Sequence, residues 1–344
     1  YPYYRDDAHN WRDRLNSLKS MGIQVVTVYI PWRHHQTDPA VPPDFTGRTQ
    51  ANRDVLGFLR LCAELGLGVI AKPGPFIHAE VNYGGLPDWV CPLNNPKIEA
   101  LLNAGGEAEV WAGSRVKADG MTIESWPLPA PFSPEFLHLT VEWMRRVAVE
   151  VIHPLSAPDG PIVALQIANE GIYSNGQHAP WAYDFSSSAL ALFCDFLAGK
   201  YADIAGLNRL YGSGYPDWSA VPAPRRWETG AAAHRYIDWG EFSAVYMDKI
   251  FRAWADPLES SLPVFINQNP PLATHYGLDA WLSRVEPERW GSVEYGFTNW
   301  VGDVSADPSA FARYVLTAKR APGPNLEENW GFAALYAPSY ADAS

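Results

Sequence analysis

A repeated alternation of short β-branched runs with amphipathic helical segments constrains the fold of this chain most strongly. It predicts parallel strands joined by crossover helices, because neighbouring parallel strands need a long connection between them. The predicted strands are residues 23–30, 67–72, 161–167, 262–268, 291–296 and 324–329. The predicted helices are residues 8–22, 53–68, 134–152, 188–202 and 309–321.

This order favours an α/β fold of the (β/α)8 TIM barrel type. A dinucleotide-binding sheet is disfavoured, because no Gly-x-Gly-x-x-Gly turn follows any strand. Six strands are visible where a barrel needs eight, so we expect an incomplete barrel that lacks its first and last strands. Residues 1–344 are interpreted as one domain with long loop insertions at about 74–133 and 171–261. Both insertions follow strands, on the side where barrel enzymes build active sites.

Composition excludes several classes of function. The net charge of −12 argues against a nucleic-acid partner, and no apolar run approaches the length of a membrane span. Cys62, Cys91 and Cys194 show no metal-ligand spacing, so neither a metal nor a cofactor is expected. The chain begins without Met, which leaves its localisation open, and nothing indicates its oligomeric state.

The aromatic content is high, with 15 Trp and 17 Tyr. Aromatic rings stack on the apolar faces of sugars, but they also fill large cores, and composition alone does not separate these two interpretations.

The segment "QIANEG" carries a charged residue at the end of a predicted buried strand. In a barrel this end opens onto the pocket, so Glu170 is a candidate catalytic carboxylate, and Asn169 could donate to a substrate hydroxyl. The alternative is a carboxylate in the first turn of a helix. A retaining glycosidase needs a second carboxylate about 5–5.5 Å away. The candidates at strand ends are Glu294, Glu327 and Glu328.

The loop "KPGPFIHAEVNYGGLPDW" (72–89) is a second candidate region. Its glycines and prolines predict an irregular loop, and irregular loops often carry function. Glu80 could line a substrate pocket or pair with a buried cation. His78 by itself is more often a packed core residue than a functional one.

Several ordered motifs resemble glycoside hydrolase family 35, the β-galactosidases. The most specific is the 72–89 loop, which resembles the family's Arg-Pro-Gly-Pro-Tyr-Ile-Cys-Ala-Glu-Trp-x-x-Gly-Gly-Leu-Pro signature. Further motifs that resemble the family are "YYRDDAHNWRDRL", "VVTVYIPWRHHQ", "DFTGRTQANRDVLGFLRLCAELGL", "ALQIANEG" and "APGPNLEENWGF". The resemblance implies a retaining exo-β-glycosidase of the TIM-barrel type, with residues 1–344 as its catalytic domain.

The resemblance also implies roles for individual residues. Glu170 would be the acid/base and Asn169 would contact the sugar 2-hydroxyl. The nucleophile maps to Glu328, with Glu327 as the alternative, because the local spacing is shorter than the family's. The subsite for a terminal galactose-like unit would be lined by Tyr29, Ala79 and Glu80.

The chain departs from the family pattern at three positions, which are Gln36, His78 and Ala168. The segment 193–227 instead resembles the family 42 β-galactosidases, which share the barrel and the retaining mechanism. The departures leave the sugar open. Two other functions also remain open: an endo-acting β-glucanase or mannanase with an open groove, and a carbohydrate-binding protein that lacks a second carboxylate near Glu170.

Overall fold

The computed structural model of the chain describes residues 1–78, 81–116, 123–167, 169, 182, 184–226 and 229–266. The predicted strands at 291–296 and 324–329 and the predicted helix at 309–321 lie outside these residues. None of the described helices is both long enough and apolar enough to cross a membrane.

A parallel sheet of four strands organises the described part of the chain. The strands follow the order β1-β2-β5-β6, with β1 at Val25–Tyr29, β2 at Gly68–Gly74, β5 at Ile162–Ile167 and β6 at Val264–Ile266. Each neighbouring pair is parallel. Each of these four strands overlaps a predicted apolar run, because strands of a parallel sheet are largely continuous in apolar residues. The carboxyl ends of these strands therefore meet at one edge.

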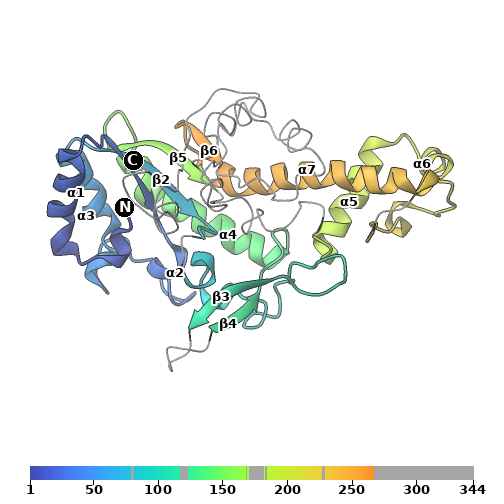
Figure 1. The fold of residues 1–344 in the computed structure, drawn as a ribbon, viewed down its shortest axis with the longest axis horizontal. Helices are drawn as coiled ribbons and strands as arrows, with labels where there is room; N and C mark the ends of the chain where they lie inside the picture. The colour runs from blue at the N-terminus through green and yellow to red at the C-terminus, as the bar shows by residue number, and fades with distance from the viewer. Residues whose placement is uncertain are drawn as a thin grey trace, which may run out of the picture.

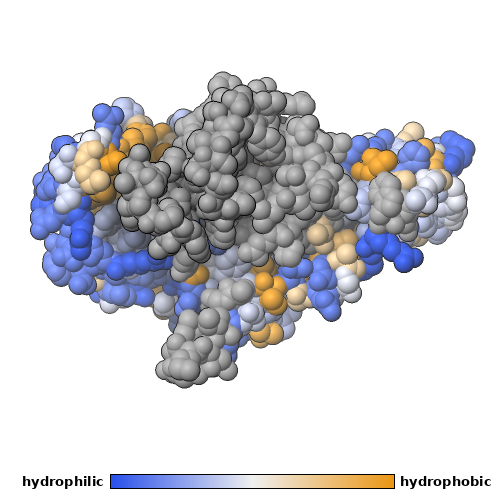
Figure 2. Space-filling model, in the orientation of Figure 1, coloured by the Kyte–Doolittle hydropathy of each residue, from blue (hydrophilic) through white to orange (hydrophobic). Residues whose placement is uncertain are grey.

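Helices α1 (Trp11–Ser20) and α3 (Val55–Glu64) pack together beside β1 and β2, at the left of Figure 1. The side chain of Asp54 caps α3 by accepting from the backbone N–H of Gly57 at 2.8 Å. Just after the helix, Gly66 adopts a left-handed conformation with φ of 69°. The surface over these helices is mainly hydrophilic (Figure 2), which fits amphipathic helices that bury only their inner face.

Two further helices lie between strands of the sheet along the chain. The short helix α2 (Trp32–His35) comes directly after β1, and α4 (Pro134–Val147) precedes β5. The rings of Trp32 and Trp143 stack with centroids 5.5 Å apart, and Trp143 Nε1 donates to the carbonyl of Pro73 at 2.9 Å. These contacts join α2, α4 and the end of β2 into one aromatic core.

The insertion at about 74–133 contains an antiparallel hairpin of β3 (Val110–Val116) and β4 (Ile123–Pro127), which the sequence analysis did not predict. The insertion at about 171–261 contains α5 (Ser187–Lys200), α6 (Ile204–Tyr211) and α7 (Ala233–Ala255). In Figure 1, α7 runs from the sheet toward α6. The predicted helix at 188–202 corresponds to α5, whereas no bounds were predicted for α6 and α7.

A buried carboxylate holds the three helices of this insertion together. Asp238 on α7 accepts hydrogen bonds from the hydroxyls of Tyr201 at 2.6 Å and Tyr211 at 2.5 Å. Lys200 donates to the other oxygen of Asp238 at 2.7 Å. Three donors satisfy a charge that would otherwise be costly to bury.

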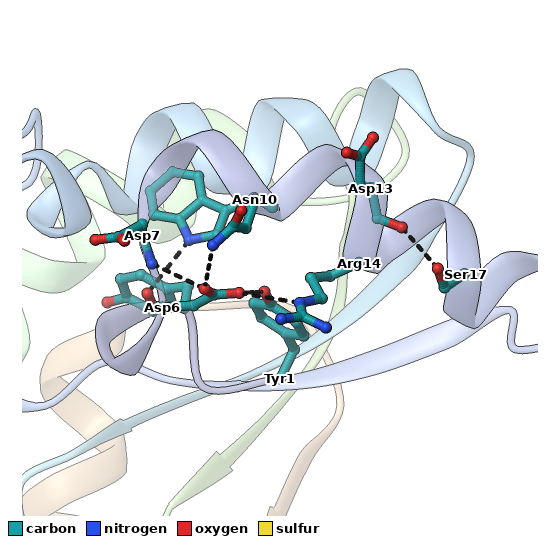
Figure 3. Close-up of polar contacts among 9 residues, drawn as sticks. Tyr1, Asp6, Asp7, Asn10, Asp13, Arg14 and Ser17 are labelled. Atoms are coloured by element: carbon teal, nitrogen blue, oxygen red, sulfur yellow. Dashed lines mark hydrogen bonds and ion pairs between the residues drawn. The ribbon is translucent and has the colours of Figure 1, made fainter.

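The turn before α1 is fixed by Asp6. Its carboxylate accepts from the Tyr1 hydroxyl, from the Asp7 backbone N–H at 2.9 Å and from Asn10 Nδ2 at 3.0 Å. Arg14 on α1 lies 3.7 Å away. Figure 3 shows Asp6 between Tyr1, Asn10 and Arg14. The hydrogen bond from Tyr1 is the main reason that the pKa of Asp6 is lowered, so Asp6 stays charged.

Candidate active site

Four polar side chains gather at the carboxyl ends of three adjacent strands. Tyr29 ends β1, Lys72 lies near the end of β2, Gln166 lies near the end of β5, and Asn169 follows β5. Lys72, Gln166 and Asn169 are buried, with exposed fractions of 3%, 1% and 4%. Buried polar groups are costly unless they serve structure or function, so this cluster is the candidate site.

Asn169 Oδ1 is the hub of the cluster. It accepts from Tyr29 Oη at 3.1 Å and from Gln166 Nε2 at 3.1 Å. Lys72 Nζ lies 3.5 Å from the same oxygen. Since all three neighbours are donors, they fix the orientation of the Asn169 amide, with its oxygen toward the strands.

Lys72 contributes a buried positive charge. Its Nζ donates to Tyr29 Oη at 3.3 Å and lies 4.6 Å from the centre of the Tyr29 ring. Tyr29 and Lys72 are register partners on neighbouring strands, so pairing of β1 with β2 brings the two side chains together. A cation at this depth favours the ionised form of any carboxylate close to it.

Gln166 offers a second polar atom. Its Oε1 is buried and has no hydrogen-bond partner among the residues that the structure describes. An unpaired buried acceptor of this kind is uncommon outside functional sites and invites a donor from a ligand or from water.

The structure thus brings Tyr29 and Asn169 together. The other predicted site residues lie outside the described residues, and these are Ala79, Glu80, Glu170, Glu294, Glu327 and Glu328. Sequence reasoning did not single out Lys72 or Gln166. Each is the one long polar side chain at the end of an otherwise apolar strand, and that break in the pattern could have identified both.

The loop after β2 is described on both sides of Ala79 and Glu80. His78 has φ of 53° and packs edge-on against the Trp111 ring, with centroids 5.0 Å apart. Arg33 on α2 holds the following turn by donating to the carbonyls of Asn82 and Leu86, both at 2.9 Å. Its other nitrogen pairs with Asp88 at 2.6 Å. The loop is therefore anchored on the strand-end side of the sheet.

A buried histidine supports α2. His35 Nδ1 donates to the Asp44 carbonyl at 2.7 Å, so its Nε2 accepts from the Tyr3 hydroxyl at 2.5 Å. Complete burial lowers the pKa of His35 from 6.5 to about 3, because the charged ring would lose its hydration. His35 is therefore neutral near pH 7 and acts as a structural hydrogen-bonding group.

Comparison with known families gives two matches. Residues 2–100 match the profile described as "Glycosyl hydrolases family 35", and residues 131–311 match that of family 42, described as "Beta-galactosidase". The likeness to family 35 noted in the sequence is confirmed. The likeness to family 42 extends well beyond the segment 193–227.

Curated relatives differ in the activity that their names state. The chain is 26% identical over 272 residues to an exo-β-D-glucosaminidase of Pyrococcus horikoshii, covering 78% of this chain and 33% of that protein. It is 30% identical over 223 residues to a β-1,2-glucosyltransferase of Ignavibacterium album, covering 64% and 28%. It is 29% identical over 197 residues to a β-galactosidase of Felis catus, covering 57% and 24%. The chain therefore spans only about a third of the length of such relatives or less.

Solved structures show the fold. A β-galactosidase from the haloarchaeon Halorubrum lacusprofundi matches with a TM-score of 0.61 and 15% identity, covering 100% of this chain and 50% of that chain. A β-galactosidase from the psychrophilic Marinomonas ef1 matches with a TM-score of 0.57 and 16% identity, covering 86% and 40%. These neighbours are TIM-barrel glycosidases, which agrees with the parallel sheet and its crossover helices.

Proposed function

The chain belongs to glycosyl hydrolase family 42, and on that premise we propose that it is the catalytic domain of a retaining exo-β-glycosidase. The domain would span residues 1–344 and form a TIM barrel that lacks its first and last strands, with the two long insertions at about 74–133 and 171–261 framing its pocket. A terminal β-galactoside is the first substrate to test. The buried cluster of Tyr29, Lys72 and Asn169 carries the proposal, since it occupies the strand ends where such enzymes bind their substrate.

The proposed chemistry is a double displacement by two carboxylates. The carboxylate of Glu328 attacks the anomeric carbon while the bond from that carbon to the leaving oxygen breaks. Glu170 gives its proton to the leaving oxygen. Glu170 then takes a proton from water, whose oxygen attacks the same carbon and releases Glu328. Glu327 is the alternative nucleophile. Neither position lies within the family 42 match, so the second carboxylate rests on the sequence motif.

The described residues would position this chemistry. Asn169 immediately precedes Glu170, so fixing the Asn169 amide also restricts the backbone that carries the acid/base. With Oδ1 turned toward three donors, Nδ2 is the end of the amide that would donate to the sugar 2-hydroxyl. Tyr29 would line the sugar subsite together with Ala79 and Glu80. The positive charge of Lys72 would favour the ionised forms of Glu170 and Glu328.

Variants at the carboxylates test the proposal. Glu170→Ala should form the glycosyl-enzyme only from aryl glycosides that have good leaving groups, because these groups depart without a proton. Azide should then give a product of retained configuration. Glu328→Ala should lose turnover, and azide should restore it with inverted configuration, because azide occupies the place of the nucleophile. Glu327→Ala is the matched control. If azide gave the inverted product with Glu327→Ala and not with Glu328→Ala, Glu327 would be the nucleophile.

The names of relatives favour one second candidate, which is an exo-acting enzyme for another β-linked sugar. The relatives include an exo-β-D-glucosaminidase and a β-1,2-glucosyltransferase. Parallel assays with aryl β-galactoside, β-glucosaminide and β-glucoside would separate these sugars. Hydrolysis within a polymer chain would favour the endo-acting alternative. Binding without turnover of any aryl glycoside would favour a non-catalytic carbohydrate-binding protein.

A further inference from the structure

A surface cleft of about 330 Å³ has several basic side chains in its lining. Its side chains include Tyr4, Arg5, Arg33, His34, Arg53 and Asn82. Three arginines therefore line the cleft, while no Asp or Glu belongs to its described lining. This is unusual in a chain whose net charge is −12, and a local concentration of positive charge indicates an anionic ligand.

Arg53 provides a cation whose charge is not already used. Its Nη1 donates to the hydroxyl of Thr49 at 2.7 Å, which is a neutral partner. Its Nε is buried and has no hydrogen-bond partner in the described part of the chain. A partly buried guanidinium without a carboxylate partner can form charge-assisted hydrogen bonds to an anion that binds nearby.

Arg33 and His34 extend the wall of the cleft, although burial lowers the pKa of His34, so its ring contributes hydrogen bonding and no charge near pH 7. Arg33 pairs with Asp88, which lies outside the lining. Arg33 also donates to the carbonyls of Asn82 and Leu86, and these hydrogen bonds fix its guanidinium in place. His34 Nε2 lies 3.1 Å from the carbonyl of Asn52, so Nε2 is the donor of that hydrogen bond. The cleft is therefore held rigid by backbone contacts on two sides.

Arg5 completes the cleft from the N-terminal turn. Its guanidinium lies 5.5 Å from the centre of the Tyr4 ring. The next residue, Asp6, is locked by Tyr1 and Asn10 (Figure 3), so the turn that carries Arg5 is fixed before any ligand arrives. A preorganised site of this kind loses less conformational entropy when a ligand binds.

The cleft is close to the candidate site along the chain. Pro31 in its lining comes two residues after Tyr29, a span of at most about 7 Å. On the other wall, Val81 immediately follows Glu80. A saccharide whose terminal unit occupies the pocket could therefore extend its next unit toward the arginines. The volume lies at the lower end of the range for small-ligand sites, which suits a single sugar unit.

We propose that this cleft, which we call the arginine cleft, binds the negatively charged group of an acidic saccharide, a carboxylate or a sulfate on the unit beyond the cleaved bond. This inference rests on the proposed glycosidase function. It makes acidic glycosides preferred substrates and gives the chain a specificity that the barrel fold does not imply.

Binding to the inactive Glu170→Gln variant of the full chain tests the proposal without turnover. Calorimetry would compare a neutral β-linked disaccharide, its uronic acid counterpart, its sulfated counterpart and inorganic sulfate. We expect one acidic disaccharide to bind at least tenfold more tightly than the neutral one. Comparing the uronic acid with the sulfated disaccharide shows whether the cleft prefers a carboxylate or a sulfate. The preference should weaken as salt rises. Equal binding of all disaccharides would overturn the proposal, as would binding of inorganic sulfate with no gain from the sugar.

Adding Arg53→Gln to this variant should remove about tenfold of the affinity for the acidic disaccharide, the worth of one charge-assisted hydrogen bond. Arg5→Gln is a second variant at an exposed position, in case the first perturbs folding. Arg60→Gln on the exposed face of α3 removes the same charge away from the cleft and should leave binding unchanged. An acidic preference that survives both Arg53→Gln and Arg5→Gln would overturn the proposal.

The two proposals fail in different ways. If the wild-type chain cleaves neutral β-glycosides but shows no charge preference, the arginine cleft inference fails alone. If acidic saccharides bind through Arg53 while no glycoside is cleaved, the cleft stands as a binding site and the glycosidase proposal fails.

Discussion

The hydroxyl of Tyr29, at the end of β1, donates to Asn169 Oδ1, just beyond the end of β5, at 3.1 Å. The two strands are not neighbours, because β2 lies between them. The hydrogen bond therefore crosses the sheet edge above Lys72, which contacts both groups. This arrangement links the residue before the proposed acid/base to the opposite side of the cluster.

Replacing Tyr29 with Phe should remove this constraint while keeping the ring. We expect kcat/KM to fall about tenfold, because one hydrogen bond to a buried group contributes about 1 kcal/mol or somewhat more. Steady-state kinetics on the preferred aryl glycoside would measure the effect. Tyr215→Phe is the matched control, since its hydroxyl contacts Arg235 at 3.1 Å in the outer helices. An equal loss from both variants would show that the Tyr29 effect is not local.

Lys72 should set the pH range of the reaction. Its positive charge favours ionised carboxylates nearby, so Lys72→Met should raise the pKa values of the proposed Glu170 and Glu328 pair. Both limbs of the pH profile of kcat/KM should then move to higher pH. Lys72→Arg keeps the charge and should keep the profile near that of the wild type. A profile unchanged in Lys72→Met would place the catalytic carboxylates away from this cluster.

Much of the barrel framework could be predicted from the sequence. The strands at 23–30, 67–72, 161–167 and 262–268 were found because they are short runs of mostly apolar residues. The β3–β4 hairpin was missed because its strands have no clear alternation, and pairing between them, not local pattern, stabilises them. The long helix α7 was readable from Trp239, Phe242 and Tyr246 at helical spacing, although its bounds were not assigned.

The site was predictable only in part, for a physical reason. Motifs point to residues that act on a substrate, such as Asn169, but not to the residues that orient them. Lys72 meets Asn169 only after β2 and β5 pair, so its role depends on strand register. Gln166 contacts Asn169 three residues along the chain, but no motif marks it as an orienting residue. The arginine cleft likewise combines segments far apart in the chain, and no local pattern indicates it.

His35 should make the fold sensitive to acid. Its pKa is about 3 in the folded chain against an ordinary value of 6.5, because burial excludes the charged form. Its contribution to stability is therefore present above about pH 6.5 and lost as the pH falls toward 3, by up to about 4–5 kcal/mol. Denaturant unfolding across this range should show a weaker pH dependence in His35→Gln. His138→Gln, at an exposed position on α4, should behave like the wild type.

Asp184 should give a pH dependence of the opposite sign. This buried carboxylate accepts from the backbone N–H groups of Leu102 at 3.3 Å and Ser186 at 2.7 Å. It also accepts from the hydroxyls of Ser186 and Tyr246, both at 2.8 Å. It therefore joins the two long insertions. Burial nevertheless raises the pKa of Asp184 from 3.8 to about 6, because desolvation outweighs the four donors.

Since the folded chain binds this proton more tightly than the unfolded chain, the contribution of Asp184 to the free energy of unfolding is present below about pH 4. It is lost as the pH rises through 6, by about 3 kcal/mol. The free energy of unfolding of Asp184→Asn should therefore lose this decline between pH 4 and 6, while the wild type keeps it. Asp195→Asn, an exposed change on α5, is the matched control and should retain the decline. If Asp184→Asn and the wild type showed parallel curves across this window, the four donors would outweigh burial and Asp184 would be ionised throughout.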